Sequence, residues 1–156
     1  MVGFAFSRRL TVRIEYIREI QSLLMELENE IHFMGRPLGQ ALLNFSQHKV
    51  GEISKFAGRV YEINQQEEVG IDIAWQKAIA EFINDWPIEQ EEWSLLGQIG
   101  EVLGKTDRAS QSAFIKMMYE KYAVQEKKAE QQRVLNEKLY RNLGVFGGIA
   151  IVLVLI

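Results

Sequence analysis

The sequence has no cysteine, only two prolines and no linker rich in serine and glycine. The absence of cysteine among 156 residues excludes a disulfide framework, thiol chemistry and any cysteine-based zinc site, and it is compatible with a cytosolic setting. With so few helix breakers, Pro37 and Pro87 alone, the chain is expected to be mostly helical. A net charge of −3 argues against a nucleic-acid binder that relies on broad positive charge. We therefore expect no nucleic-acid partner.

Residues that carry enzyme chemistry are equally scarce. The two histidines, His32 and His48, follow Asn29 and Phe45 at a spacing of three residues, so neither completes the Glu-x-x-His pair of a di-iron bundle. No glycine-rich phosphate loop is present. Spacing alone leaves a Ser/His/Asp arrangement open, but no motif supports one. We expect a protein that is not an enzyme and that has no cofactor or metal site.

Helical periodicity dominates the chain. In residues 10–34 apolar side chains recur every seven residues in two seams, one formed by Leu10, Ile17, Leu24 and Ile31 and the other by Ile20, Leu27 and Met34. The remaining face is predicted to be solvated, and its charged residues are Arg13, Glu15, Arg18, Glu19, Glu26, Glu28 and Glu30. Shorter apolar patterns predict helices over residues 37–45, 50–63, 71–83 and 87–103, and a long one from about residue 108 to beyond 139. The fold class is therefore all-α, a compact antiparallel bundle of about six helices in a single domain.

Several individual side chains have expected places in that bundle. We expect Ile83, Met117 and Val124 to pack against the core, together with the tryptophans Trp75, Trp86 and Trp93. Residues 46–48 are expected to form a turn, and Pro87 to open the fifth helix. Gly97 and Gly100 permit close contact between helices. The segment 125–133, QEKKAEQQR, is polar on every side and predicts a solvent-exposed strut.

The stretch of residues 100–115, GEVLGKTDRASQSAFI, organises the rest of the chain. Gly104 follows the last apolar residues of one helix, and glycine accepts the left-handed conformation that ends helices. Thr106 or Asp107 then caps the N-terminus of the next helix. This short connection predicts two neighbouring antiparallel helices.

The tail, LGVFGGIAIVLVLI over residues 143–156, has no charged residue. As a helix it spans about 21 Å, and Leu139 and Tyr140 lengthen it toward the roughly 30 Å of a bilayer core, with Lys138 and Arg141 reaching the headgroups. A buried core helix is the alternative to a membrane anchor. We favour an anchor over residues 138–156, whose membrane-facing residues are Leu143, Val145, Phe146, Ile149, Ile151, Val152, Leu153, Val154, Leu155 and Ile156.

The N-terminal segment, residues 1–7, is read either as a frayed terminus or as the remnant of a membrane helix, and we assign it as the remnant. Its six apolar residues are too few to cross a bilayer. Basic residues flank both apolar ends of the chain, Arg8, Arg9 and Arg13 at one and Lys138 and Arg141 at the other. The positive-inside rule therefore places the helical domain, residues 8–137, in the cytoplasm.

Acidic residues are frequent at the expected ends of the third to fifth helices. One patch is expected from Glu67, Glu68, Asp72, Asp85, Glu89, Glu91 and Glu92. It is either a solvated surface with acids at helix starts or a docking face for a basic partner.

The chain also resembles the stage III sporulation protein AB family of endospore-forming bacteria. The resemblance covers nearly the whole chain and is carried by Glu30-Ile31, Gly35-x-Pro37-Leu38-x-x-Ala41, Ala74-Trp75, Gly100-Glu101-x-Leu103-Gly104-x-x-Asp107-Arg108-x-Ser110-Gln111 and the tail after Asn142-Leu143-Gly144. Members of this family usually begin with a full transmembrane helix, whereas this chain has only MVGFAF before Ser7. That difference leaves a topology with two anchors in question.

The resemblance implies a function. The family is similar to the cytoplasmic domain of platform component F of type II secretion machines, and it belongs to the sporulation channel between mother cell and forespore, beside a secretion-type ATPase. A six-helix domain in the cytoplasm and a place in the mother-cell membrane facing the forespore follow. No catalytic residue is implied. Candidate partner-binding residues at the corner, which are equally candidates for maintaining the fold, are Glu101, Asp107, Arg108 and Gln111, and Glu67, Glu68 and Asp72 add the acidic patch. A tail-anchored scaffold or signalling adaptor unrelated to secretion is the alternative.

Overall fold

The computed structural model describes residues 2–35 and 37–156. Six α-helices follow one another along the chain, with bounds α1 Val2–Asn29, α2 Leu38–His48, α3 Glu52–Gln66, α4 Ile71–Phe82, α5 Gln90–Val102 and α6 Arg108–Leu155. A short π-helical turn, η1 Glu30–Met34, extends α1. No strand occurs in the described ranges. The prediction of an all-α bundle of about six helices is therefore confirmed.

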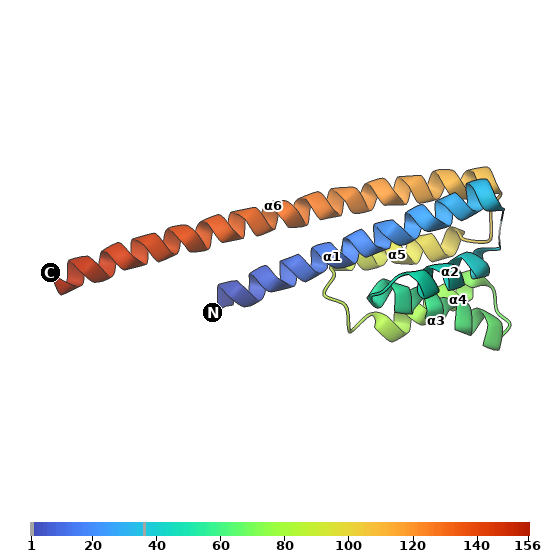
Figure 1. Cartoon of the computed structure of the whole chain (residues 1–156), viewed down its shortest axis with the longest axis horizontal. Coiled ribbons are helices and arrows are strands. Elements are labelled where there is room, and N and C mark those ends of the chain that lie inside the picture. Colours follow the sequence, from blue (N-terminus) through green and yellow to red (C-terminus); the bar gives the residue numbers. More distant parts are fainter. Residues whose placement is uncertain (1, 36) are drawn as a thin grey trace.

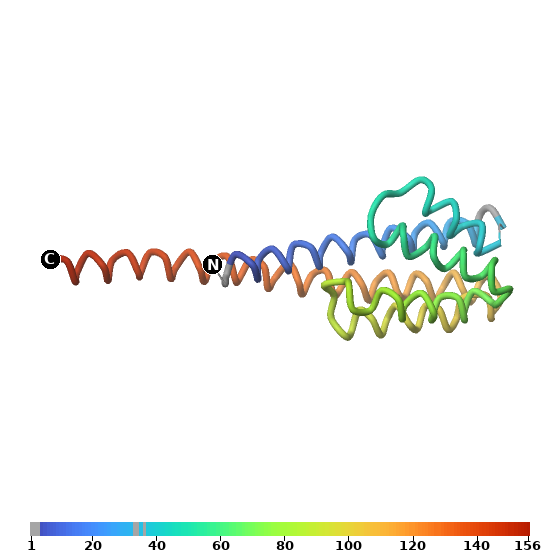
Figure 2. Tube along the Cα trace, turned by 90° about the horizontal axis from the view of Figure 1, so that it is seen from below, coloured from blue at the N-terminus to red at the C-terminus, as the bar shows by residue number. Residues whose placement is uncertain are grey.

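Two long helices form the frame of the molecule. α1 and α6 lie side by side and antiparallel, and α5 lies along them, while α2, α3 and α4 pack at one end (Figure 1). Beyond the N-terminus of α1, α6 continues alone as an unaccompanied rod (Figure 2). The α5–α6 corner and the α1–α2 turn lie at the end of the molecule opposite this rod.

The seam positions of α1 are buried as the heptad pattern predicts. Leu10, Ile17, Leu24 and Ile31 have almost no exposed surface, and the same holds for Ile20 and Leu27 of the second seam. The side chain of Met34, the remaining seam position, lies outside the part of the structure that is described. Trp75, Trp86 and Trp93 are buried as predicted. Trp86 stacks on Trp93 with ring centroids 4.9 Å apart, and Phe56 and Tyr16 pack against it.

Helix bounds differ from the predictions where capping and continuity outweigh local pattern. α1 begins at Val2, not at residue 10. α2 includes the expected turn 46–48. α5 begins at Gln90, not at Pro87, because Glu89 caps it in a reciprocal capping box with Glu92.

The predicted strut over residues 125–133 is wrong as a segment exposed on all sides. Gln125 and Ala129 are buried against the bundle, since a small or uncharged side chain at these two positions lets α6 approach its neighbours. Arg18 on α1 pairs with Glu126 at 2.8 Å and with Glu130 at 3.3 Å. In this stretch, polar residues of α6 thus contribute to its contact with α1.

Other burial predictions also need correction. Arg13 and Glu30, expected on the solvated face of α1, are buried. Conversely, Ile83, Met117 and Val124 are exposed, because Ile83 follows the last turn of α4 and the other two lie on the outer face of α6.

Candidate functional site

The α5–α6 corner forms as the sequence predicts. Leu103 is buried after the last turn of α5, and Gly104 has φ +80°, a conformation that disfavours any side chain. Asp107 is the N-cap of α6, and its carboxylate accepts hydrogen bonds from Ser110 N at 3.0 Å and Ser110 Oγ at 2.7 Å. These hydrogen bonds lower the pKa of Asp107. Of the two predicted caps, the structure thus selects Asp107, whose side chain also lies on the surface.

Arg108 joins the corner to the α1–α2 turn. Gly35, with φ +62°, ends η1, and a Cβ added there would lie 2.6 Å from Arg108 Nη2. The guanidinium therefore lies directly over the Gly35 backbone. Arg108 is exposed and makes no ion pair with any residue that the structure describes. An exposed arginine with no carboxylate partner among the described residues is suited to bind a carboxylate of another protein.

Gln111 has a supporting role in the same corner. Its side chain is buried, and Nε2 donates to the Thr106 carbonyl at 2.6 Å. This bond closes the loop before α6 from the inside. The structure therefore places Gln111 beneath the corner surface and leaves Glu101, Asp107 and Arg108 exposed on it.

Part of the predicted acidic patch adjoins this corner. Lys105 Nζ lies 3.2 Å from Asp72 Oδ2, and Lys105 holds the pKa of Asp72 below its usual range. Asp72 and Lys105 also line a shallow hollow with Glu101. Glu67 pairs with Lys77, while Glu68 is exposed in the α3–α4 loop with φ +52°.

The expectation of one continuous acidic patch is wrong. Glu67, Glu68 and Asp72 lie near the start of α4, whereas Asp85, Glu89 and Glu91 follow its end. The 12 residues of α4 separate the two groups by about 18 Å. Glu92 lies inside the bundle with no exposed surface.

A larger hollow opens on the side of the corner. Its volume is about 580 Å³, and α2, α3, the start of α4 and the corner line it. The lining residues include Pro37, Leu38, Tyr61, Asn64, Ile71 and Leu103. Polar and apolar groups share the lining of the hollow, with apolar surface in the majority, and the lining contains no cluster of catalytic groups.

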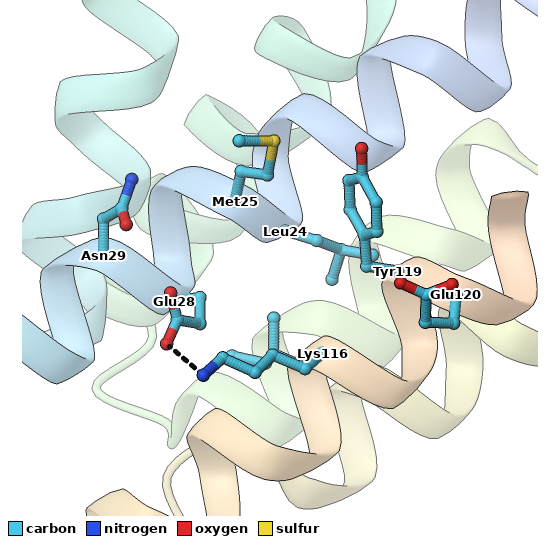
Figure 3. Close-up of a pocket in the computed structure, with 8 residues that line it drawn as sticks. Leu24, Met25, Glu28, Asn29, Lys116, Tyr119 and Glu120 are labelled. Atoms are coloured by element: carbon cyan, nitrogen blue, oxygen red, sulfur yellow. Dashed lines mark ion pairs between the residues drawn. The ribbon is translucent and has the colours of Figure 1, made fainter.

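A second, apolar groove of about 270 Å³ lies between α1 and α6. Figure 3 shows Leu24, Met25 and Tyr119 around it, with the Glu28–Lys116 ion pair at one end. The Lys116 Nζ atom is 3.6 Å from Glu28 Oε1, which also accepts from Ser112 Oγ. Among the described residues, no group of histidine, aspartate and glutamate side chains is arranged to hold a metal ion.

Sequence reasoning missed a buried ion pair between α1 and α5. Arg13 Nη2 lies 2.5 Å from Glu92 Oε1, and both side chains are almost completely buried. The Tyr122 hydroxyl donates to the Glu92 carbonyl at 2.7 Å, which adds α6 to the same contact. The heptad register could have predicted the burial of Arg13. This residue stands three residues after Leu10 and four before Ile17, so it occupies a seam position itself.

The apolar end of α6 has the properties expected of a membrane segment. α6 is long and apolar enough, by length and composition alone, to cross a bilayer, and none of its most apolar window is buried. Every residue from 143 to 156 is exposed, including all of the predicted membrane-facing side chains. The alternative of a buried core helix is therefore wrong.

Comparison with known proteins gives a consistent result. The family model described as stage III sporulation protein AB matches residues 1–156. Stage III sporulation protein AB of Bacillus subtilis (strain 168) is 28% identical over 153 residues, which cover 98% of this chain and 90% of that protein. A solved structure of a stage III sporulation protein AB superposes with a TM-score of 0.74 at 25% identity, covering 80% of this chain and 98% of the solved one. With its long paired helices, its Gly104–Asp107 corner and a match that spans every residue, this chain belongs to the stage III sporulation protein AB family.

Proposed function

We propose that this protein is a non-enzymatic, membrane-anchored platform of the sporulation channel between mother cell and forespore, and that its corner docks a cytosolic secretion-type ATPase. The bundle would face the mother-cell cytoplasm, with the apolar end of α6 in the membrane that faces the forespore. Membership of a sporulation family supports the setting. The similarity to the type II secretion platform, noted from sequence, supports the partner.

One observation carries this proposal. A single uninterrupted helix, α6, begins at the exposed corner with Arg108 and ends in the exposed apolar segment. Its 48 residues correspond to about 70 Å, so the two surfaces lie at opposite ends of the molecule (Figure 1). A rigid rod that links a docking surface to a membrane segment transmits position and force between them.

The corner is chemically suited to a protein partner. It presents the cation of Arg108 and the carboxylates of Asp107 and Glu101, all exposed. Exposed charge of both signs on a fixed backbone gives specificity and fast association with a complementary surface. The partner is therefore expected to present an acidic side chain to Arg108.

The test is capture of the purified ATPase by the full chain in lipid nanodiscs. Arg108→Ala should reduce binding at least tenfold while circular dichroism remains that of the wild type. Lys49→Ala is a matched control, because Lys49, just after the opposite end of α2, is exposed and forms no ion pair with a described residue. Unchanged binding by a folded Arg108→Ala variant would refute docking at the corner.

Loss of binding on changing Glu67 and Glu68, without any effect of Arg108→Ala, would instead favour a tail-anchored scaffold unrelated to secretion. In that case the acidic residues of the α3–α4 loop would contact the partner, and the corner would serve only the fold.

A further inference from the structure

The antiparallel contact of α1 with α6 brings basic residues from both ends of the sequence to one level of the molecule. Arg13 Nη1 donates to Gln132 Oε1 at 3.4 Å, which fixes the register of the two helices. Five residues further along this register, Arg8 lies level with residue 137, beside Lys138 and about one turn before Arg141. Figures 1 and 2 show the N-terminus of α1 lying along α6 where its unaccompanied part begins.

Positive charge is in excess at this level, although two acidic residues lie near it. Glu137 is 3.8 Å from Arg133, and Glu89 lines a hollow with Arg9. Arg8, Arg9, Lys138 and Arg141 are exposed, and none of them forms an ion pair with a residue in the described part of the chain. Acidic residues are absent from residues 2–14 and from residues 138–156. Several other cations of the bundle have carboxylate partners, namely Arg18, Lys55, Arg59, Lys77, Lys105 and Lys116.

Aromatic and aliphatic side chains surround these cations. Phe4 is 77% exposed and Phe6 49% exposed on α1, and Leu139 and Tyr140 are exposed on α6 at the same level. Exposed aromatic rings among basic residues, next to a wholly apolar helix, have the composition of a membrane interface. A free phosphate ion offers no apolar surface to the exposed phenylalanines, whereas a phospholipid does.

We infer that these four residues, Arg8, Arg9, Lys138 and Arg141, form a basic collar that binds the headgroups of anionic phospholipids. The inference rests on the proposed membrane anchoring and adds to it a preference for lipid charge. A lysine or arginine close to an anionic bilayer surface strengthens the association roughly fivefold. Because α1 supplies half of the collar, the folded bundle, and not the tail alone, selects the lipids.

The test is native mass spectrometry of the full chain released from nanodiscs that contain equal amounts of phosphatidylglycerol and phosphatidylcholine. The wild type should retain phosphatidylglycerol preferentially, and Arg8→Gln/Arg9→Gln should reduce this preference by at least tenfold. The matched control, Lys127→Gln/Lys128→Gln, removes two exposed cations about three turns of α6 away from Lys138, neither of which pairs with a described residue. It should retain the wild-type preference, and circular dichroism checks the fold of each variant.

The outcomes separate the two proposals. If the wild type enters the discs but retains both lipids equally, or if both double variants behave alike, the collar is refuted and the anchor stands. If the chain does not enter the discs, the anchor and the collar fall together. If millimolar inorganic phosphate displaces the retained phosphatidylglycerol, the collar is a site for free anions and the lipid assignment is wrong.

Discussion

Two glycines one turn apart on α5 should respond to the same substitution with opposite signs. A Cβ added at Gly100 would lie 2.3 Å from Trp75 Cδ1 and 2.6 Å from Trp75 Cγ, whereas a Cβ at Gly97 has no atom within 4 Å. Both glycines are inside the same helix, so alanine brings each the same gain in helix propensity, about 1 kcal/mol. The difference between the two variants therefore measures the contact with Trp75 alone.

The clash in Gly100→Ala cannot be relieved without moving Trp75, and that movement costs stability. Trp75 is fully buried, donates from Nε1 to the Leu96 carbonyl at 2.8 Å and packs edge-on against Phe56 with ring centroids 5.0 Å apart. Moving the indole weakens both interactions, and overpacking of this kind costs about 1–3 kcal/mol. We expect Gly97→Ala to raise the free energy of unfolding by roughly 0.5–1 kcal/mol. In Gly100→Ala the same gain offsets part of the overpacking cost, so we expect a net loss of up to about 2 kcal/mol.

The assay is urea denaturation of the full chain in a mild detergent, followed by tryptophan fluorescence and by helical circular dichroism. The two probes should report the same transition in each variant. A Gly100→Ala variant that is as stable as Gly97→Ala would show that α4 and α5 are not as closely packed as the structure has them.

Three further predictions concern buried and exposed polar contacts. Arg13→Met should lower the free energy of unfolding by about 3–5 kcal/mol, because it leaves the Glu92 carboxylate buried without its partner. In urea denaturation, adding Glu92→Gln to this variant should recover part of the loss. If the two losses simply add, the two residues are not coupled. Asp107→Asn should remove a pH dependence, because the lowered pKa of Asp107 gives stability that is present above the unfolded-state pKa of about 4 and is lost as the pH falls through the lower folded-state value. The Tm difference between wild type and Asp107→Asn should accordingly shrink between pH 6 and pH 2, and a constant difference would contradict the capping role. Ala129→Glu should accelerate amide exchange in α6 around residue 129, whereas Gln131→Glu, on the exposed side, should leave it unchanged.

The sequence predicted what depends on local periodicity and capping. The α1 seam, the corner at Gly104 and the cap at Asp107 are all present, because each depends on residues within a few turns of one another. The exposed apolar end of α6 was predictable for the same reason, since fourteen uncharged residues stand together.

Contacts between distant segments were not predictable in this way. The polarity of residues 125–133 concealed the burial of Gln125 and Ala129, because the charges that flank them are matched on α1, more than a hundred residues earlier. The same applies to Arg13, whose carboxylate partner belongs to α5. The prediction of one acidic patch was wrong because its residues are close in the sequence but lie at opposite ends of α4.

Because α6 is one continuous helix, the distance of the bundle from the apolar segment and the direction in which the bundle faces both depend on the number of residues between them. Nine residues separate Ala129, a fully buried position, from Lys138 at the collar, a rise of about 14 Å. Each residue inserted there would lift the corner by about 1.5 Å and turn it by about 100° about the helix axis. A single insertion would thus aim Arg108 at a different neighbour, whereas an insertion of seven residues, about two full turns, would return it to within about 20° of its original direction. The length of this short stretch therefore sets the azimuth at which a partner must approach.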